Sequence, residues 1–124
     1  MDLKNQVCSL ELAKKLKELR VKQESLFYWS EYQTRRMKAP KWAIMYEEHG
    51  TDWYSAFTVA ELGEMLPPGY HSVKVSAGKE FMVFFYEAEH SYMDYAQTEN
   101  TEADARAAML VYLIENNLIN PKDQ

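Results

Sequence analysis

Hydrophobic residues are most concentrated in one run past the middle of the chain, Phe81-Met82-Val83-Phe84-Phe85-Tyr86. Side chains alternate between the two faces of a strand, so an unbroken apolar run makes both faces hydrophobic. We therefore expect residues 81–86 to form a central strand that is packed on both sides.

Weaker patterns on either side of this run predict its neighbours in a sheet. Val73 and Val75 alternate with polar residues, which is typical of a half-buried strand over residues 70–76. Segment 92–97 predicts a further strand. The short polar segments that join these strands suit turns, with Gly78 in the first of them. Together they predict an antiparallel meander.

Aromatic residues mark a second group of strands nearer the N-terminus. We expect strands over residues 26–32 and 42–46, because both are rich in aromatic and branched side chains. A turn at 48–51 should lead into a short strand at 52–54 that closes a hairpin. The segment between the first two strands, residues 33–40, is basic and ends at a proline, so we expect a loop there.

Two of three expected helices lie in the first half of the chain. Ser9 is placed to cap a helix that ends near residue 19, with a leucine stripe on one face. Lysines 14, 15 and 17 fall on the other face. Arg20 stands where glycine often ends a helix. Thr58, with a glutamate three residues later, has capping-box spacing and predicts a short second helix.

The third helix is expected to begin after Thr101 and to run to about Asn116. Apolar residues occupy most of its circumference, which predicts burial on more than one side. The additional apolar face could meet a helix of the same chain or a second subunit. Asn117 suits the position just after the helix, with Leu118 packing back, and Pro121 prevents continuation.

These elements predict a single α+β domain over residues 1–124. We expect an antiparallel, meander-rich sheet of about five or six strands. The first and third helices should cover it, with the short helix at one end.

Composition limits the class of protein. Apolar residues make up 47% of the 124 residues and aromatic residues 14%, which favours a folded domain. Cys8 is the single cysteine, so no internal disulfide and no thiolate metal cage is expected. The N-terminus has no apolar signal segment, and no run of apolar residues could span a membrane. We expect a soluble, cytoplasmic protein that does not bind membranes.

The charged residues are distributed unevenly. Residues 1–41 contain ten basic and five acidic residues, whereas the remainder contains four basic and fourteen acidic ones. Such a division can mark an electrostatic docking face, and it can also be ordinary solvated surface.

No catalytic, cofactor-binding or metal-binding constellation is recognisable. His49, His71 and His90 fall in expected turns or strand ends, without a partner at metal-binding spacing. Cys8 precedes a helix N-terminus, which can lower a thiol pKa, although a small buried residue is the simpler interpretation. The isolated glycines form no phosphate-binding loop. We therefore expect no cofactor and no enzymatic activity.

Basic and aromatic residues are interleaved between residues 26 and 42, and this segment is the candidate interaction surface. Its candidate residues are Tyr28, Tyr32, Arg35, Arg36, Lys38, Lys41 and Trp42. Surfaces of this composition bind single-stranded nucleic acid through phosphate contacts and base stacking. The overall charge of −5 opposes that reading, and aromatic residues in strands are often core.

Four stretches carry a resemblance to a known group of proteins, and each is a cap or a core pattern. They are residues 7–13, 23–29, 56–63 and 101–106 with the helix that follows to 119. In these stretches the chain resembles small uncharacterised proteins encoded by bacteriophages and by prophage regions of bacterial genomes. The resemblance implies a bacterial host cell and implies no activity or site residue.

The function expected from these observations is a non-enzymatic protein-interaction module of phage or prophage type. Its partner would be a host or virion protein, and self-association through the third helix or the aromatic strands is a further expectation. Binding of single-stranded nucleic acid through residues 26–42 is the alternative. A small enzyme with an unrecognised site is the second alternative.

Overall fold

The structure is a computed structural model that describes residues 2–48, 52–87 and 90–121, with the backbone alone for residues 87 and 90–94. Most of the turn expected at 48–51 and part of the turn expected at 89–91 lie outside these residues. The helices are α1 (Leu10–Glu18), α2 (Val59–Met65) and α3 (Glu102–Glu115), and two short 3-10 turns cover Leu3–Asn5 and Ser76–Gly78. The strands are β1 (Tyr28–Tyr32), β2 (Lys41–Met45), β3 (Trp53–Ser55), β4 (Tyr70–Val75), β5 (Glu80–Glu87) and β6 (His90–Glu99).

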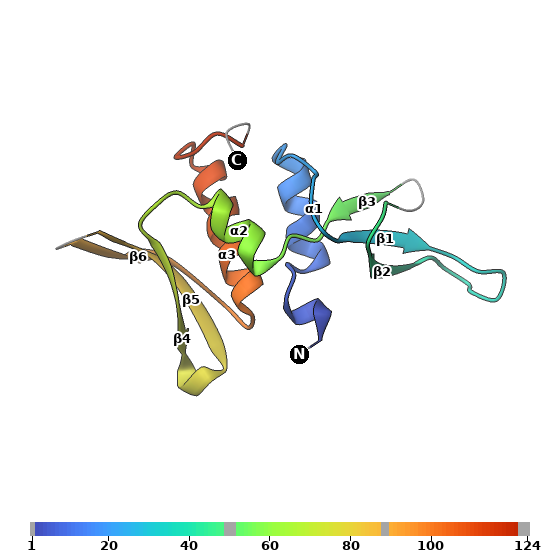
Figure 1. Ribbon diagram of the computed structural model, residues 1–124, viewed down its shortest axis with the longest axis horizontal. Helices are drawn as coiled ribbons and strands as arrows, with labels where there is room; N and C mark the ends of the chain where they lie inside the picture. The colour runs from blue at the N-terminus through green and yellow to red at the C-terminus, as the bar shows by residue number, and fades with distance from the viewer. Residues whose placement is uncertain (1, 49–51, 88–89, 122–124) are drawn as a thin grey trace.

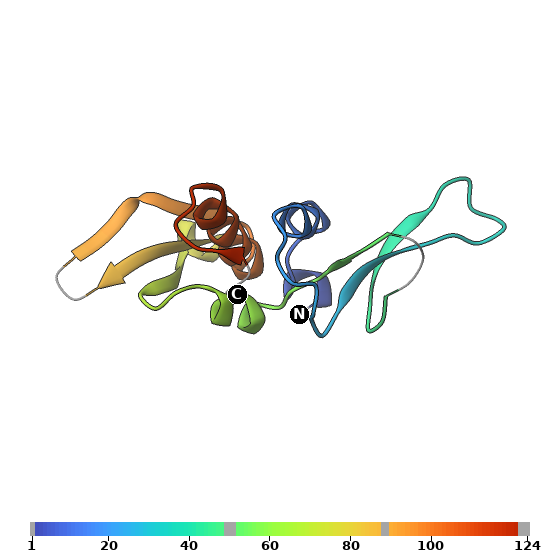
Figure 2. The same ribbon diagram turned by 90° about the horizontal axis from the view of Figure 1, so that it is seen from above.

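The α+β class is confirmed, but the expectation of one continuous sheet is wrong. The six described strands form two three-stranded antiparallel sheets, in the orders β2-β1-β3 and β4-β5-β6. The sheets lie at opposite ends of an elongated molecule, with the three helices between them (Figures 1 and 2). Hydrophobic alternation predicts strands but does not say which strands pair, and here the packed helices separate the two groups.

The first sheet has β1 at its centre. Tyr28 pairs with Met45 on β2 and with Ser55 on β3, so β1 has a neighbour on each side. The short strand after residue 51 was expected to pair with β2 as a hairpin, and that prediction is wrong. The connection from β2 crosses to the other edge of β1 instead, because β3 there contacts α1.

The second sheet is the expected meander, with β5 as its central strand. Val83 on β5 is fully buried and packs with Ala105, Met109 and Leu113 of α3. The alternate residues of β5 point away from α3, and Tyr86 there is 48% exposed. The prediction that the run 81–86 is packed on both sides is therefore wrong for the outer face.

Strand β4 is half-buried as expected, but Ser72 and not Val73 lies on the face toward the helix. Ser72 accepts a hydrogen bond from Arg106 Nε of α3 at 3.0 Å. Val73 lies on the other face and is 38% exposed. Arg106 also donates to the carbonyl of Val59 at 2.8 Å and pairs with Glu102 at 3.2 Å. Polar contacts of Arg106 therefore join β4, α2 and α3 at the point where these three elements meet.

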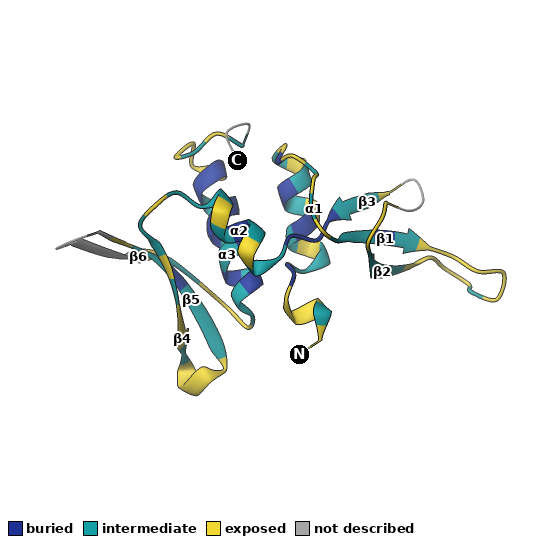
Figure 3. Ribbon diagram, in the orientation of Figure 1, coloured by how far each residue is buried: buried dark blue, intermediate teal, exposed yellow. Residues whose placement is uncertain are grey.

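The main core lies between the three helices, where the buried residues gather in Figure 3. Leu16 of α1, Leu62 of α2 and Leu110 of α3 are fully buried, together with Phe57 just before α2. Helix α3 contacts α1, α2 and all three strands of the second sheet. Much of its wide apolar surface is thus covered within the chain, by α1, α2 and the second sheet.

The expected N-terminal caps are confirmed. The hydroxyl groups of Ser9, Thr58 and Thr101 accept hydrogen bonds from backbone N–H groups of α1, α2 and α3 at 3.3, 3.2 and 3.1 Å. Glu61 completes the capping box by accepting from the Thr58 N–H at 2.9 Å. Asp104 accepts from the Ser9 N–H at 2.7 Å, which joins the N-terminal ends of α1 and α3.

Two helices end on non-glycine residues in the left-handed conformation. Arg20 has φ 70° and Asn117 has φ 57°. The next N–H in each case, that of Val21 or Leu118, donates back to the carbonyl five residues earlier, as in a Schellman motif. The prediction that Asn117 ends α3 is therefore confirmed. Leu118 packs back only in part, because its side chain is 61% exposed.

Candidate binding surfaces

Helix α1 is held against the first sheet by lysines as well as by leucines. Lys17 Nζ lies 4.3 Å from the centroid of the Trp53 ring and donates to the Trp53 carbonyl at 2.7 Å. Lys14 Nζ lies 5.3 Å from the Trp42 ring and 5.8 Å from the Tyr54 ring. The sequence pattern placed these lysines only on the helix face away from the leucine stripe. In the structure their ammonium groups lie near aromatic rings, which attract ammonium groups within about 6 Å.

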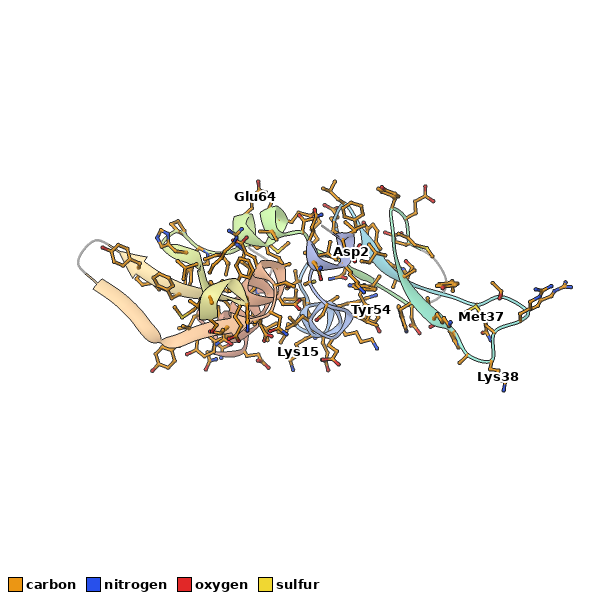
Figure 4. The ribbon with its side chains drawn as sticks, turned by 90° about the horizontal axis from the view of Figure 1, so that it is seen from below. Asp2, Lys15, Met37, Lys38, Tyr54 and Glu64 are labelled. Carbon is orange, nitrogen blue, oxygen red and sulfur yellow. The ribbon has the colours of Figure 1, made fainter. Side chains whose placement is uncertain are left out.

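The loop between β1 and β2, residues 33–40, is built on a turn and extends beyond the sheet; we call it the basic arm. The Met37 N–H donates to the Thr34 carbonyl at 3.1 Å, so Arg35 and Arg36 are the two central residues of this turn. In Figure 4, Met37 and Lys38 lie on the part of the loop farthest from the helices. The hydrogen bond therefore places the two arginines at the end of a projection.

The basic arm and the first residue of β2 concentrate positive charge that no described residue neutralises through an ion pair. Residues 32–46 contain Arg35, Arg36, Lys38 and Lys41 and no acidic residue. All four side chains are exposed, and none forms an ion pair with a residue that the structure describes. Elsewhere in this half of the molecule, Lys15 pairs with Glu115 and Lys22 with Glu24. The excess of basic over acidic residues in the range 1–41 is thus available to a binding partner mainly at these four residues.

An aromatic sheet face adjoins the arm; we call it the outer face of the first sheet. The strand register places Tyr28, Tyr32, Lys41 and Trp53 on this face. Tyr28 and Trp53 meet edge to face at 5.5 Å, and Tyr32 is 38% exposed. Trp42, which sequence reasoning grouped with them, lies on the opposite face, 5.6 Å from Tyr54. The structure thus unites six of the seven predicted surface residues on the outer face and arm.

A groove between α3 and the second sheet was not foreseen from the sequence. It has a volume of about 490 Å³, within the range of small-molecule sites. Four aromatic rings line it, those of Tyr70, Phe85, Tyr95 and Tyr112, and none of the described side chains that line it is charged. Tyr95 and Tyr112 are stacked at 5.6 Å, and Tyr70 meets Phe85 at 5.3 Å. Burial and the neighbouring Tyr112 raise the pKa of Tyr70, so its hydroxyl stays protonated.

The cysteine and histidines do not form a reactive centre within the described residues. Cys8 is fully buried, and burial raises its pKa to about 12, so the simpler interpretation of this residue is confirmed. His71 is exposed on the outer side of β4, with its ring 6.2 Å from that of Phe84. The side chains of His49 and His90 lie outside the described part.

Neither a metal-binding cluster nor a membrane-spanning helix is found among the described residues. No group of three or more His, Cys, Asp or Glu side chains in ranges 2–48, 52–87 and 90–121 is arranged to hold a metal ion. No helix in these ranges is long and apolar enough to cross a membrane.

Comparison with known proteins adds no relative. No family model, no curated protein and no solved structure matches the chain. The likeness to phage and prophage proteins therefore remains a prediction, as does the absence of enzymatic activity.

Proposed function

We propose that this chain is a non-enzymatic protein-binding module of phage or prophage type. Its binding surface is the basic arm together with the outer face of the first sheet, and its partner presents an acidic surface. The observation that carries the proposal is the set of four exposed basic residues that form no ion pair with a described residue, placed beside Tyr28, Tyr32 and Trp53.

The composition of this surface matches what protein interfaces use. Tyrosine, tryptophan and arginine supply a large share of binding energy at such interfaces, because they combine a broad contact area with hydrogen-bonding groups. The arm's charges steer an acidic partner toward the surface, and the half-buried aromatic rings provide apolar area at its base. The expected partner is a host or virion protein, in the cytoplasm of a bacterial cell.

Affinity purification from the bacterial host, with mass spectrometry, tests this proposal. The informative bait is the charge-reversal variant Arg35→Glu/Arg36→Glu, compared with wild type. A matched control is Lys4→Glu/Lys22→Glu, which changes net charge equally at two exposed lysines outside the arm. Partners captured by wild type and control, and lost by the arm variant, support the proposal. Partners captured equally by all three baits contradict it.

Single-stranded nucleic acid is a second candidate, favoured by the exposed Tyr32 beside Lys41 at the base of the arm. If all four basic residues contact phosphates, log K should fall with log salt at a slope of about −3, at roughly −0.7 per contact. Fluorescence anisotropy with a labelled oligonucleotide measures this slope. Undetectable binding at low salt would eliminate the candidate.

A further inference from the structure

We propose that the basic arm also binds a second copy of this chain, whose aromatic groove between α3 and the second sheet receives Arg35 and Arg36. This inference rests on the proposed function, since it gives the same arm a partner in addition to the host or virion protein expected there. The two copies would associate head to tail, with the arm end of one against the groove end of the next.

The groove has the chemistry of a site for an organic cation. Tyr70, Phe85, Tyr95 and Tyr112 present aromatic rings, whose faces attract ammonium and guanidinium groups. Among the described side chains that line the groove, no basic residue would repel such a group, and none would pair with an anionic ligand.

The half of the molecule around the groove also favours a cation. Residues 58–121 contain ten acidic residues and three basic ones. Two of the three basic side chains already have partners, because Arg106 pairs with Glu102 and Lys74 lies 6.0 Å from the Phe81 ring. This half therefore carries a net negative field that attracts a positively charged projection.

The arm supplies the complementary group and cannot supply it to its own chain. Arg35 and Arg36 are the central residues of the arm's turn, and guanidinium groups stack well on aromatic rings. The arm and the second sheet lie at opposite ends of the molecule (Figure 1). A contact between them must therefore join two copies. Because the contacting surfaces differ, the association forms a ring if the rotation closes and an open chain otherwise.

Complementary variants test the inference by sedimentation velocity. The arm variant is Arg35→Gln/Arg36→Gln, and the groove variant is Tyr95→Lys, at a tyrosine that is 60% exposed and so tolerates substitution. Tyr86→Lys is the matched control, because Tyr86 is 48% exposed on the same sheet but lies outside the groove lining.

Wild type and the Tyr86→Lys control are expected to associate as concentration rises, and more weakly as salt increases from 0.1 M to 1 M, where the screening length falls from about 10 to about 3 Å. For the arm variant alone and for the groove variant alone, the association constant should fall about tenfold or more, as expected for the loss of two cation–π contacts. An equimolar mixture of the two should restore a species of two chains and nothing larger, because each such pair uses the one intact arm and the one intact groove.

Two outcomes overturn the inference. If wild type remains monomeric at low salt and high concentration, the partner is not a second copy, and arm-dependent capture of another acidic protein can still support the proposed function. If association survives in both variants, the chain self-associates through a different surface. If the affinity purification captures no host protein through the arm while head-to-tail association is intact, the host or virion partner is rejected instead.

Discussion

The two sheets differ in how they are attached to the helices. The second sheet packs Val83 against Met109 and Leu113 of α3, in a cluster from which water is excluded. The first sheet meets α1 partly through Lys14 and Lys17, whose ammonium groups lie over aromatic rings. One junction is stabilised mainly by buried apolar area, and the other includes polar contacts that remain accessible to water.

This difference shows how one small chain can leave aromatic residues near its surface and still fold. Apolar burial contributes stability in proportion to the area removed from water, so the α3 side supplies most of it. The first sheet contributes less, and its rings are only half-buried. The arm extends from this less buried sheet, where its substitution should disturb the core least.

The largest effect is expected at the α3 junction. Leu113→Ala should lower the free energy of unfolding by about 2–5 kcal/mol, because Leu113 is 2% exposed and its truncation leaves a cavity. Urea denaturation measures the change. Leu118→Ala, at a side chain that is 61% exposed, is the control and should change stability by less than about 0.5 kcal/mol. Equal losses for the two variants would contradict this account of the core.

A smaller loss is expected at the α1 junction. Lys17→Met keeps the length of the side chain but removes the contact with the Trp53 ring and the hydrogen bond to its carbonyl. We expect about 1–2 kcal/mol of destabilisation in urea. Lys15→Met, which breaks an exposed pair with Glu115, should cost less than about 1 kcal/mol. If the Lys17 variant is as stable as the control, lysine contacts do not hold this sheet.

A gain in stability is expected at the end of α1. Arg20 has φ 70°, a conformation in which a side chain costs roughly 1 kcal/mol and glycine does not. Arg20→Gly should therefore raise the melting temperature, by an amount that corresponds to about 0.5–1 kcal/mol. Arg20→Ala removes the same charge and keeps the strain, so it should give no such gain. A similar increase in both variants would assign the effect to charge.

The smallest effect is a pH dependence at the point where α1 and α3 are joined. Burial raises the pKa of Asp104 above its ordinary value of 3.8, so the folded chain binds this proton more tightly than the unfolded chain. The contribution of Asp104 to stability is therefore greatest below pH 3.8 and falls as pH rises through the raised folded value. Asp104→Asn keeps an oxygen that can accept from Ser9. Wild type should lose stability relative to this variant as pH rises, in urea titrations from pH 3 to 7, and a constant difference would contradict the assignment.

The sequence by itself determined the local elements, because their causes lie within a few residues. Ser9, Thr58 and Thr101 each satisfy N–H groups of the helix that they precede, so their caps were predictable from spacing. Asn117 ends α3 for an equally local reason. The α+β class followed from these elements, and the basic segment 33–40 was correctly placed between two strands.

Only the tertiary structure decided what the elements contact. Strand β3 pairs with β1, not β2, because its position depends on contact with α1, and residue alternation carries no record of pairing partners. The groove remained unseen for the same reason, since it joins Tyr70, Tyr95 and Tyr112 from three elements that are distant in sequence. Strand period and cap chemistry are short-range properties, whereas a sheet edge, an open face or a groove exists only after distant segments have packed.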